Sequence, residues 1–150
     1  MIVLQNQSIE QFCIVLESKK KGKRKMHFKN TEHKQIFMTL VRRKTNPCPN
    51  EYLSALYLIT ADAALWYAAR EKITDRRIPI RDIDLSGVGA VGYTFAKIAE
   101  DILRGTTNVT IRDLCDKYVI SEKNLKLVTE AIHICRGGYH VLPFVDQAHS

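Results

Sequence analysis

The chain has 150 residues, of which 45% are hydrophobic and 26% are charged, and its net charge is +7. A chain of this length can bury about 70% of its unfolded surface, so one domain folds without disulfides or a structural metal. The composition excludes collagen-like and low-complexity chains, and no apolar run approaches the roughly 20 residues that span a bilayer.

The positive charge is concentrated in one segment. Residues 19–44 contain 11 Lys and Arg and one acidic residue, whereas the rest of the chain contains 12 basic and 15 acidic residues. The sequence is therefore a slightly acidic domain that carries a basic segment. We expect residues 1–25 to form an N-terminal helix and a basic linker, residues 26–142 a helical domain, and residues 143–150 a tail.

Apolar residues recur at helical spacing along most of the chain, and capping residues mark the helix starts. After a short helix that follows Ser8, the pattern predicts helices over residues 31–44, 50–60, 63–73, 90–103, 110–118 and 122–137. The expected caps are Thr31, Asn50, Thr60 or Asp62, Thr110 and Ser121, with Gly105 ending one helix.

Two of these helices, 50–60 and 63–73, are apolar nearly all round and are the best core candidates. Residues 76–86 alternate apolar and polar side chains around Pro79, which predicts an extended segment, either an edge strand or an ordered loop. The sequence therefore predicts an all-α or mostly α fold. We expect a compact bundle of about six helices with one extended segment and a basic N-terminal appendage.

A glycine run at residues 87–92 fits the dinucleotide-binding pattern G-x-G-x-x-G, and Asp113 follows about 20 residues later, where a ribose-binding acid is usual. The context opposes a nucleotide site. The segment before the glycines contains Arg81, Asp82 and Asp84, whereas a central parallel strand is buried on both faces. We interpret the run as a turn that lets the next helix pack closely.

A pattern typical of a helix-turn-helix unit runs from residue 110 to residue 128. Cys115 is small where the two helices would cross, and Tyr118 is apolar. The second helix would present Lys123 and Lys126 to DNA phosphates. Val119 stands where a turn residue with positive φ, usually glycine or asparagine, is expected. The same pattern also fits two packed helices with no role in DNA binding.

Basic residues are the candidates for contact with a partner or a nucleic acid, because they attract phosphates and carboxylates. The alternative for the first group is a solvated linker. The candidates are Lys19, Lys20, Lys21, Lys23, Arg24, Lys25, Arg42, Arg43, Lys44, Lys123 and Lys126.

Ligand types that suit Zn²⁺ occur in the C-terminal part of the chain, at Cys115, His133, Cys135 and His140. Their spacing is not that of a known zinc motif, and positions i and i+2 of a helix face different directions. We predict no cofactor, and a structural zinc on these four residues is the alternative.

Catalytic patterns have little support in the sequence. The carboxylate pairs Asp82/Asp84 and Glu100/Asp101 are adjacent or nearly adjacent in exposed-looking segments, and there is no nucleophile elbow, P-loop or HExxH. The four cysteines form no CxxC pair, which is typical of free thiols in a reducing cytoplasm. We therefore expect a cytoplasmic protein that is not an enzyme.

From Met26 onward the chain resembles an uncharacterised family of small helical proteins from Gram-positive bacteria, their phages and mobile elements. Three stretches carry the resemblance: MHFKNTEHK at residues 26–34, YLITAD at 57–62 and EAIHI at 130–134. It covers residues 26–140 and implies a compact helical domain without known catalytic residues. The glycine run departs from the family pattern, and residues 1–25 lie outside it.

This resemblance implies a function by analogy, because small proteins of phages and mobile elements often bind host defence proteins. We expect a non-enzymatic inhibitor of a host defence protein, an anti-CRISPR-like protein that blocks an RNA-guided nuclease in the cytoplasm of the bacterial host. Its partner would be a nuclease or nucleoprotein complex, with nucleic acid contacted through the basic segment and no membrane involved. The alternative is a helix-turn-helix DNA-binding regulator that uses residues 110–128 and a basic arm.

Overall fold

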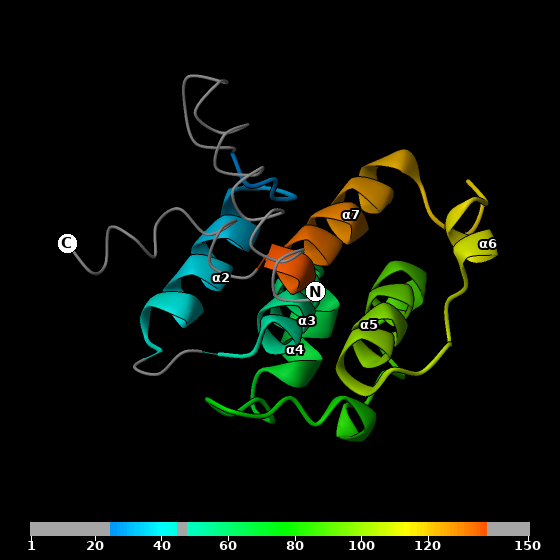
Figure 1. Cartoon of the computed structure of the whole chain (residues 1–150). Helices are drawn as coiled ribbons and strands as arrows, with labels where there is room; N and C mark the ends of the chain where they lie inside the picture. The colour runs from blue at the N-terminus through cyan, green and yellow to red at the C-terminus, as the bar shows by residue number, and fades with distance from the viewer. Residues whose placement is uncertain (1–24, 45–47, 138–150) are drawn as a thin grey trace, which may run out of the picture.

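The computed structural model describes residues 25–44 and 48–137 (Figure 1). Within these residues the chain forms six α-helices, one 3-10 helix and no strand, so the predicted helical fold is confirmed. The elements are α2 (Thr31–Arg42), α3 (Asn50–Ala61), α4 (Ala63–Ala69), η1 (Ile80–Asp82), α5 (Gly89–Arg104), α6 (Ile111–Leu114) and α7 (Glu122–Gly137). The helix predicted after Ser8 lies outside the described residues.

Helix α3 is the centre of the fold. Ten of its 12 residues are buried, as its apolar pattern predicted. Helices α2, α4, α5 and α7 all pack against it, and Figure 1 shows α2, α5 and α7 arranged around it. Tyr57 of α3, Phe37 of α2 and Phe95 of α5 are among the largest fully buried side chains. Burial of a large apolar side chain stabilises the folded state by about 1.5–3 kcal/mol. Since four helices bury side chains against α3, this helix contributes most to the packing of the fold.

Side-chain caps set several helix boundaries at the predicted places. The Asp62 carboxylate accepts a hydrogen bond from the Leu65 N–H at 3.0 Å, which ends α3 and begins α4. Gly105 ends α5 with φ of 70°, a conformation that glycine adopts without strain. Thr110 and Asp113 form a reciprocal capping box at the start of α6. These three caps confirm predictions from residue type and spacing.

Other helix boundaries differ from the prediction. Helix α2 is capped by Asn30, whose side chain accepts a hydrogen bond from the His33 N–H, rather than by Thr31. The N-cap position of α3 is Pro49 rather than Asn50. Helix α4 ends at Ala69 rather than at Ile73. As a core candidate it contributes one face, with Leu65 and Ala69 buried and Trp66 and Ala68 partly buried against the core.

The segment at residues 76–86 is an ordered loop that contains η1, not an edge strand. Ile78, Ile80 and Ile83 are buried and hold this loop against the helices. Pro79 lacks an N–H group, and the Asp82 N–H bonds to the Pro79 carbonyl at 2.9 Å to form the short helical turn. The alternating apolar residues therefore anchor a loop rather than one face of a strand.

The predicted first helix of the helix-turn-helix unit is wrong beyond its first turn. Helix α6 ends at Leu114, and Cys115 and Tyr118 are exposed rather than packed against α7. The Asp116 side chain accepts a hydrogen bond from the Tyr118 N–H, and the Asp116 carbonyl accepts one from the Val119 N–H. These bonds offer the backbone a turn in place of a continued helix.

The glycine run forms a turn into α5, as we interpreted it. No strand precedes it in the described part of the chain, and Gly89 has φ of 84° at the start of α5. A Cβ atom at Gly92 would lie 2.5 Å from Asp62 Oδ2 and closer still to Val88 Cγ1, so α5 approaches α4 through glycine. The Asp113 carboxylate is engaged by the Thr110 N–H in the capping box.

Among the described helices, none combines the length and the apolar character that a membrane crossing requires.

Candidate functional site

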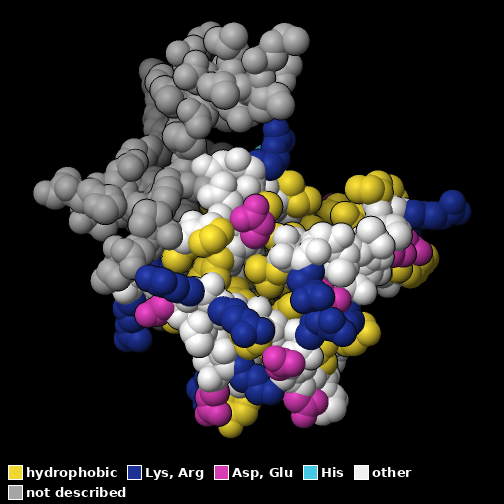
Figure 2. All heavy atoms as spheres, turned by 60° about the horizontal axis from the view of Figure 1, so that its bottom comes forward, with side chains coloured by type: hydrophobic (Ala, Val, Ile, Leu, Met, Phe, Trp, Pro, Cys, Tyr) yellow, Lys and Arg dark blue, Asp and Glu magenta, His cyan; other side chains and the backbone are white. Residues whose placement is uncertain are grey.

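An open groove with a volume of about 870 Å³ lies where the loop after α4, the first turn of α3 and the end of α5 meet. In Figure 1 the loop lies below the helices. Figure 2 brings that face forward and shows separate groups of Lys and Arg side chains over it, with apolar and a few acidic side chains between them. We call this hollow the arginine groove.

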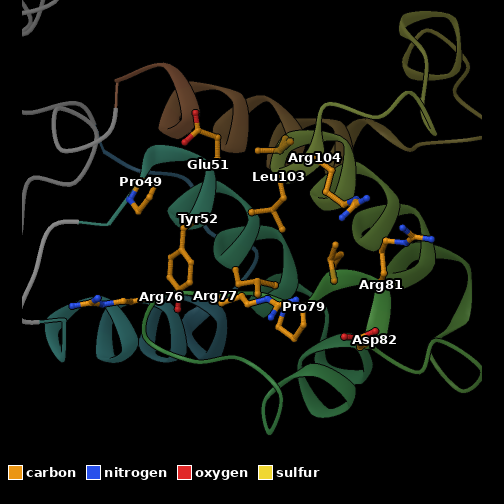
Figure 3. Close-up of a pocket in the computed structure, with 13 residues that line it drawn as sticks. Pro49, Glu51, Tyr52, Arg76, Arg77, Pro79, Arg81, Asp82, Leu103 and Arg104 are labelled. Carbon is orange, nitrogen blue, oxygen red and sulfur yellow. The ribbon is translucent and has the colours of Figure 1, made fainter.

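Four arginines line the arginine groove: Arg76, Arg77, Arg81 and Arg104. All four are exposed, and their guanidinium groups form no hydrogen bond or ion pair with any of the described residues. Figure 3 shows that Arg81 and Arg104 lie toward the same end of the groove although they come from different elements. Four guanidinium groups without an ion-pair partner among the described residues make this hollow attractive to anions.

A tight turn positions Arg76 and Arg77. The Thr74 N–H bonds to the Arg77 carbonyl at 2.9 Å, and the Arg77 N–H bonds to Thr74 Oγ1 at 3.1 Å. Tyr52 of α3 fixes this turn, because its hydroxyl donates to the Thr74 carbonyl at 2.6 Å. The buried helix therefore holds the first two arginines in place.

Lys44 adds a second tie to the same turn. Its ammonium group donates to the Tyr52 hydroxyl at 2.7 Å and to the Asp75 carbonyl at 3.2 Å, and it pairs with the Asp75 carboxylate at 3.4 Å. Burial opposes charge on Lys44, but these hydrogen bonds outweigh it and raise the pKa of Lys44. Burial also raises the pKa of the Tyr52 hydroxyl. The amine is thus charged and the phenol neutral at pH 7.

The other two arginines stand at element ends. Arg81 is the middle residue of η1. Ile80 before it is buried, and the carbonyl of Asp82 after it accepts a hydrogen bond from Lys72. Arg104 is the last residue of α5, before the glycine cap. A cation at a helix C-terminus is stabilised by the helix dipole. Both side chains are exposed while their backbones are fixed.

The arginine groove also contains carboxylates and apolar surface. Glu51 and Asp82 line it, so four arginines against two carboxylates leave an excess of two positive charges. Apolar side chains also line it, including Pro79, Ile102 and Leu103, and we call them the apolar floor. With the arginines, which we call the rim, and two carboxylates that accept hydrogen bonds, the groove offers three kinds of contact.

None of the predicted basic residues that the structure describes lines this groove. Lys19, Lys20, Lys21, Lys23 and Arg24 lie outside the described residues, and Lys25, Arg42, Arg43, Lys123 and Lys126 are exposed elsewhere. Lys44 contacts the groove through one residue, because it donates a hydrogen bond to Tyr52, which lines the groove.

The predicted zinc ligands are not gathered in the described residues. Cys115 is an exposed thiol after α6, whereas His133 and Cys135 belong to α7, and His140 lies outside the described residues. Within residues 25–44 and 48–137, no three His, Cys, Asp or Glu side chains form a group able to hold a metal ion. The zinc hypothesis stays a prediction, which metal analysis of protein purified without added metal tests.

His33 is the most buried titratable group with a shifted pKa, at 2% exposure. Its Nδ1 accepts a hydrogen bond from the Lys29 N–H at 3.0 Å, so its Nε2 carries the proton and donates to the Tyr57 carbonyl at 2.9 Å. Burial lowers the pKa of His33 to about 4, aided by the nearby Lys29 and His27, and the bond to Tyr57 opposes this. Both ring nitrogens therefore form hydrogen bonds to the backbone that stabilise the fold.

No family model, curated protein or solved structure matches the chain. The resemblance over residues 26–140 therefore stays a prediction, and the arginine groove is interpreted from its own chemistry.

Proposed function

We propose that this protein works by binding, and that it blocks a host defence protein of the RNA-guided nuclease class. The observation that carries the binding part is the arginine groove, whose four guanidinium groups have no carboxylate partner among the described residues. The assignment of the partner class rests on the resemblance of residues 26–140, which is an analogy at the level of family.

Two further observations favour binding over nucleophilic catalysis. His33 uses both ring nitrogens in hydrogen bonds to the backbone, so neither nitrogen is available as a general base. Burial raises the pKa values of Cys48 and Cys135, whereas a nucleophilic cysteine needs a lowered pKa. His33 is thus committed to the fold, and burial disfavours the thiolates of Cys48 and Cys135.

A cleavage assay with purified RNA-guided nucleases, each with guide and target, tests the proposal. We expect the protein in stoichiometric excess to reduce cleavage by at least one such nuclease. The variant Arg77→Gln/Arg81→Gln should lose most of the inhibition, whereas Arg112→Gln/Arg136→Gln removes the same charge outside the groove and should retain it. Undiminished cleavage across several such systems would contradict the proposal.

The groove variant is suited to this test because it should fold. Arg77 and Arg81 are exposed, and their side chains bond to none of the described residues. Surface substitutions of this kind usually change stability by about 0.5 kcal/mol or less. Equal melting temperatures for the two double variants, measured by circular dichroism, establish that lost inhibition reflects the groove.

The alternative is DNA binding through residues 110–128, and one observation favours it: Lys123 and Lys126 are exposed in the first turns of α7. The four-residue length of α6 opposes it, because a helix-turn-helix unit needs a longer first helix to brace the second. A gel shift with the protein's own promoter region distinguishes the two. Binding that Lys123→Ala/Lys126→Ala abolishes would favour the regulator.

A further inference from the structure

We infer that the arginine groove binds a single strand of nucleic acid, with phosphates on the arginines and bases over the apolar floor. The inference rests on the proposed function in naming the ligand class of the same groove. RNA-guided nucleases hold single strands of this chemistry, both as guide RNA and as displaced DNA.

The choice of cation in the groove points to an oxyanion that can present two oxygens to one guanidinium group. The sequence contains ten Arg and 13 Lys, yet four arginines and no lysine line the groove. A guanidinium group presents several N–H donors in a fixed plane that matches two oxygens of a phosphate, whereas an ammonium acts as a compact point charge. Since these arginines form no ion pair with the described residues, their donors are available to a ligand.

The apolar floor and the two carboxylates decide between classes of anion. Glu51 and Asp82, which line the groove beside the arginines, repel the carboxylates of an acidic peptide and the phosphates of a nucleic acid alike, so the ligand is favoured that also brings hydrogen-bond donors to them. A nucleic acid uses them, because carboxylates accept hydrogen bonds from the amino groups of bases such as cytosine. Pro79, Ile102 and Leu103 provide apolar surface for base and sugar faces.

The need to reach bases favours a single strand over a duplex. In a duplex the bases stack on one another and expose only their edges, so an apolar floor gains little contact with them. An unpaired strand can turn its bases toward the floor and its phosphates toward the rim, as in other single-strand binding grooves.

Fluorescence anisotropy with the full chain tests this inference. The probes are RNA and DNA strands of one sequence, about 12 nucleotides long, the matching DNA duplex, and an oligoglutamate peptide of the same charge. We expect at least one single strand to bind more tightly than both the duplex and the peptide. Arg77→Gln/Arg81→Gln should weaken that binding about tenfold or more, since it removes charge-assisted hydrogen bonds, whereas Arg112→Gln/Arg136→Gln should change it less than threefold.

Salt dependence provides a second readout that a general loss of affinity would not mimic. Each phosphate contact with a single strand contributes about −0.7 to the slope of log K against log salt concentration. The groove variant should therefore have a slope shallower by about 1.4 than the wild type. Equal slopes and affinities in the two double variants, or tighter binding of the duplex or the peptide, would overturn the inference.

The failures of the two proposals are distinguishable. If the groove variant loses nuclease inhibition but no single strand binds the wild type, the inference is wrong and the proposed function stands. If strands bind through the groove but no nuclease is inhibited, the inference stands and the assigned partner is wrong.

Discussion

The stability of this protein should fall in mild acid because of His33. The neutral ring accepts a hydrogen bond at Nδ1 and donates one at Nε2, and it packs against the rings of Phe28 and Tyr57. A second ring proton would remove the acceptor for the Lys29 N–H and leave a charge in an apolar site. This is why the folded-state pKa lies well below the ordinary value.

The size and direction of the effect follow from the two pKa values. His33 has a pKa of about 4 in the folded protein, against 6.5 as the ordinary value for histidine. Between these values the unfolded chain binds more protons than the folded one, so stability is fully present above pH 6.5 and is lost as the pH falls toward 4. The linkage relation gives a loss of about 2 kcal/mol between pH 7.5 and pH 5 and about 3 kcal/mol in total.

Urea unfolding at pH 7.5 and pH 5, followed by circular dichroism, measures this loss. The control is His33→Gln, which keeps an N–H donor and does not titrate. We expect the variant to be less stable than the wild type at pH 7.5, and this difference to shrink by about 2 kcal/mol at pH 5. Comparison with the variant removes the pH-dependent contributions that the two proteins share.

A constant difference between wild type and His33→Gln at the two pH values would refute the reasoning. It would mean that His33 titrates alike in the folded and unfolded states, which contradicts burial as the cause of its lowered pKa.

Three other substitutions test contacts that position the helices and the arginine groove. Gly92→Ala should destabilise by about 1–3 kcal/mol because its Cβ would overlap Val88 and the Asp62 cap; thermal unfolding checks this against Gly87→Ala, where space is open and no loss is expected. Tyr52→Phe should lower the urea midpoint by the equivalent of about 1 kcal/mol, since the Thr74 carbonyl loses its donor; the exposed Tyr93→Phe is its control and should leave the midpoint unchanged. Thr110→Ala should cost about 1 kcal/mol in urea unfolding through the lost cap of α6, and an unchanged midpoint would show that this one-turn helix frays without consequence.

The predictable part of the fold is the part that local chemistry specifies. Asp62, Gly105 and the Thr110–Asp113 pair end or begin helices because their own atoms satisfy the terminal backbone groups. Prediction went wrong where burial depends on distant neighbours. Tyr118 looked like an apolar packing residue of the helix-turn-helix pattern, but it is 89% exposed because none of the described elements covers it.

The candidate site shows the same limit. Arg76, Arg77 and Arg81 stand in one stretch of sequence, but its alternating apolar and polar residues predicted only an extended segment and no site. Arg104 joins them only through the packing of α5 against α3, which brings the end of one helix beside the start of the other. The signal that could have found the site is the adjacent pair Arg76-Arg77 before a proline-containing loop with buried isoleucines.

The excess of positive charge lies in one segment of the sequence, but the folded structure gathers other cations in the arginine groove. By counting, the positive charge belongs to residues 19–44, and the remaining chain is slightly acidic. Yet four cations of that acidic remainder share one hollow, and a ligand responds to the field within a Debye length of about 8 Å rather than to a segment total. The end of the basic segment reaches the same place, since Lys44 bonds to Tyr52 and Asp75 and so braces the turn that carries Arg76. The basic segment and the arginine groove are therefore joined through one hydrogen-bonded cluster, and a ligand held in the groove lies next to the residue where the basic segment ends.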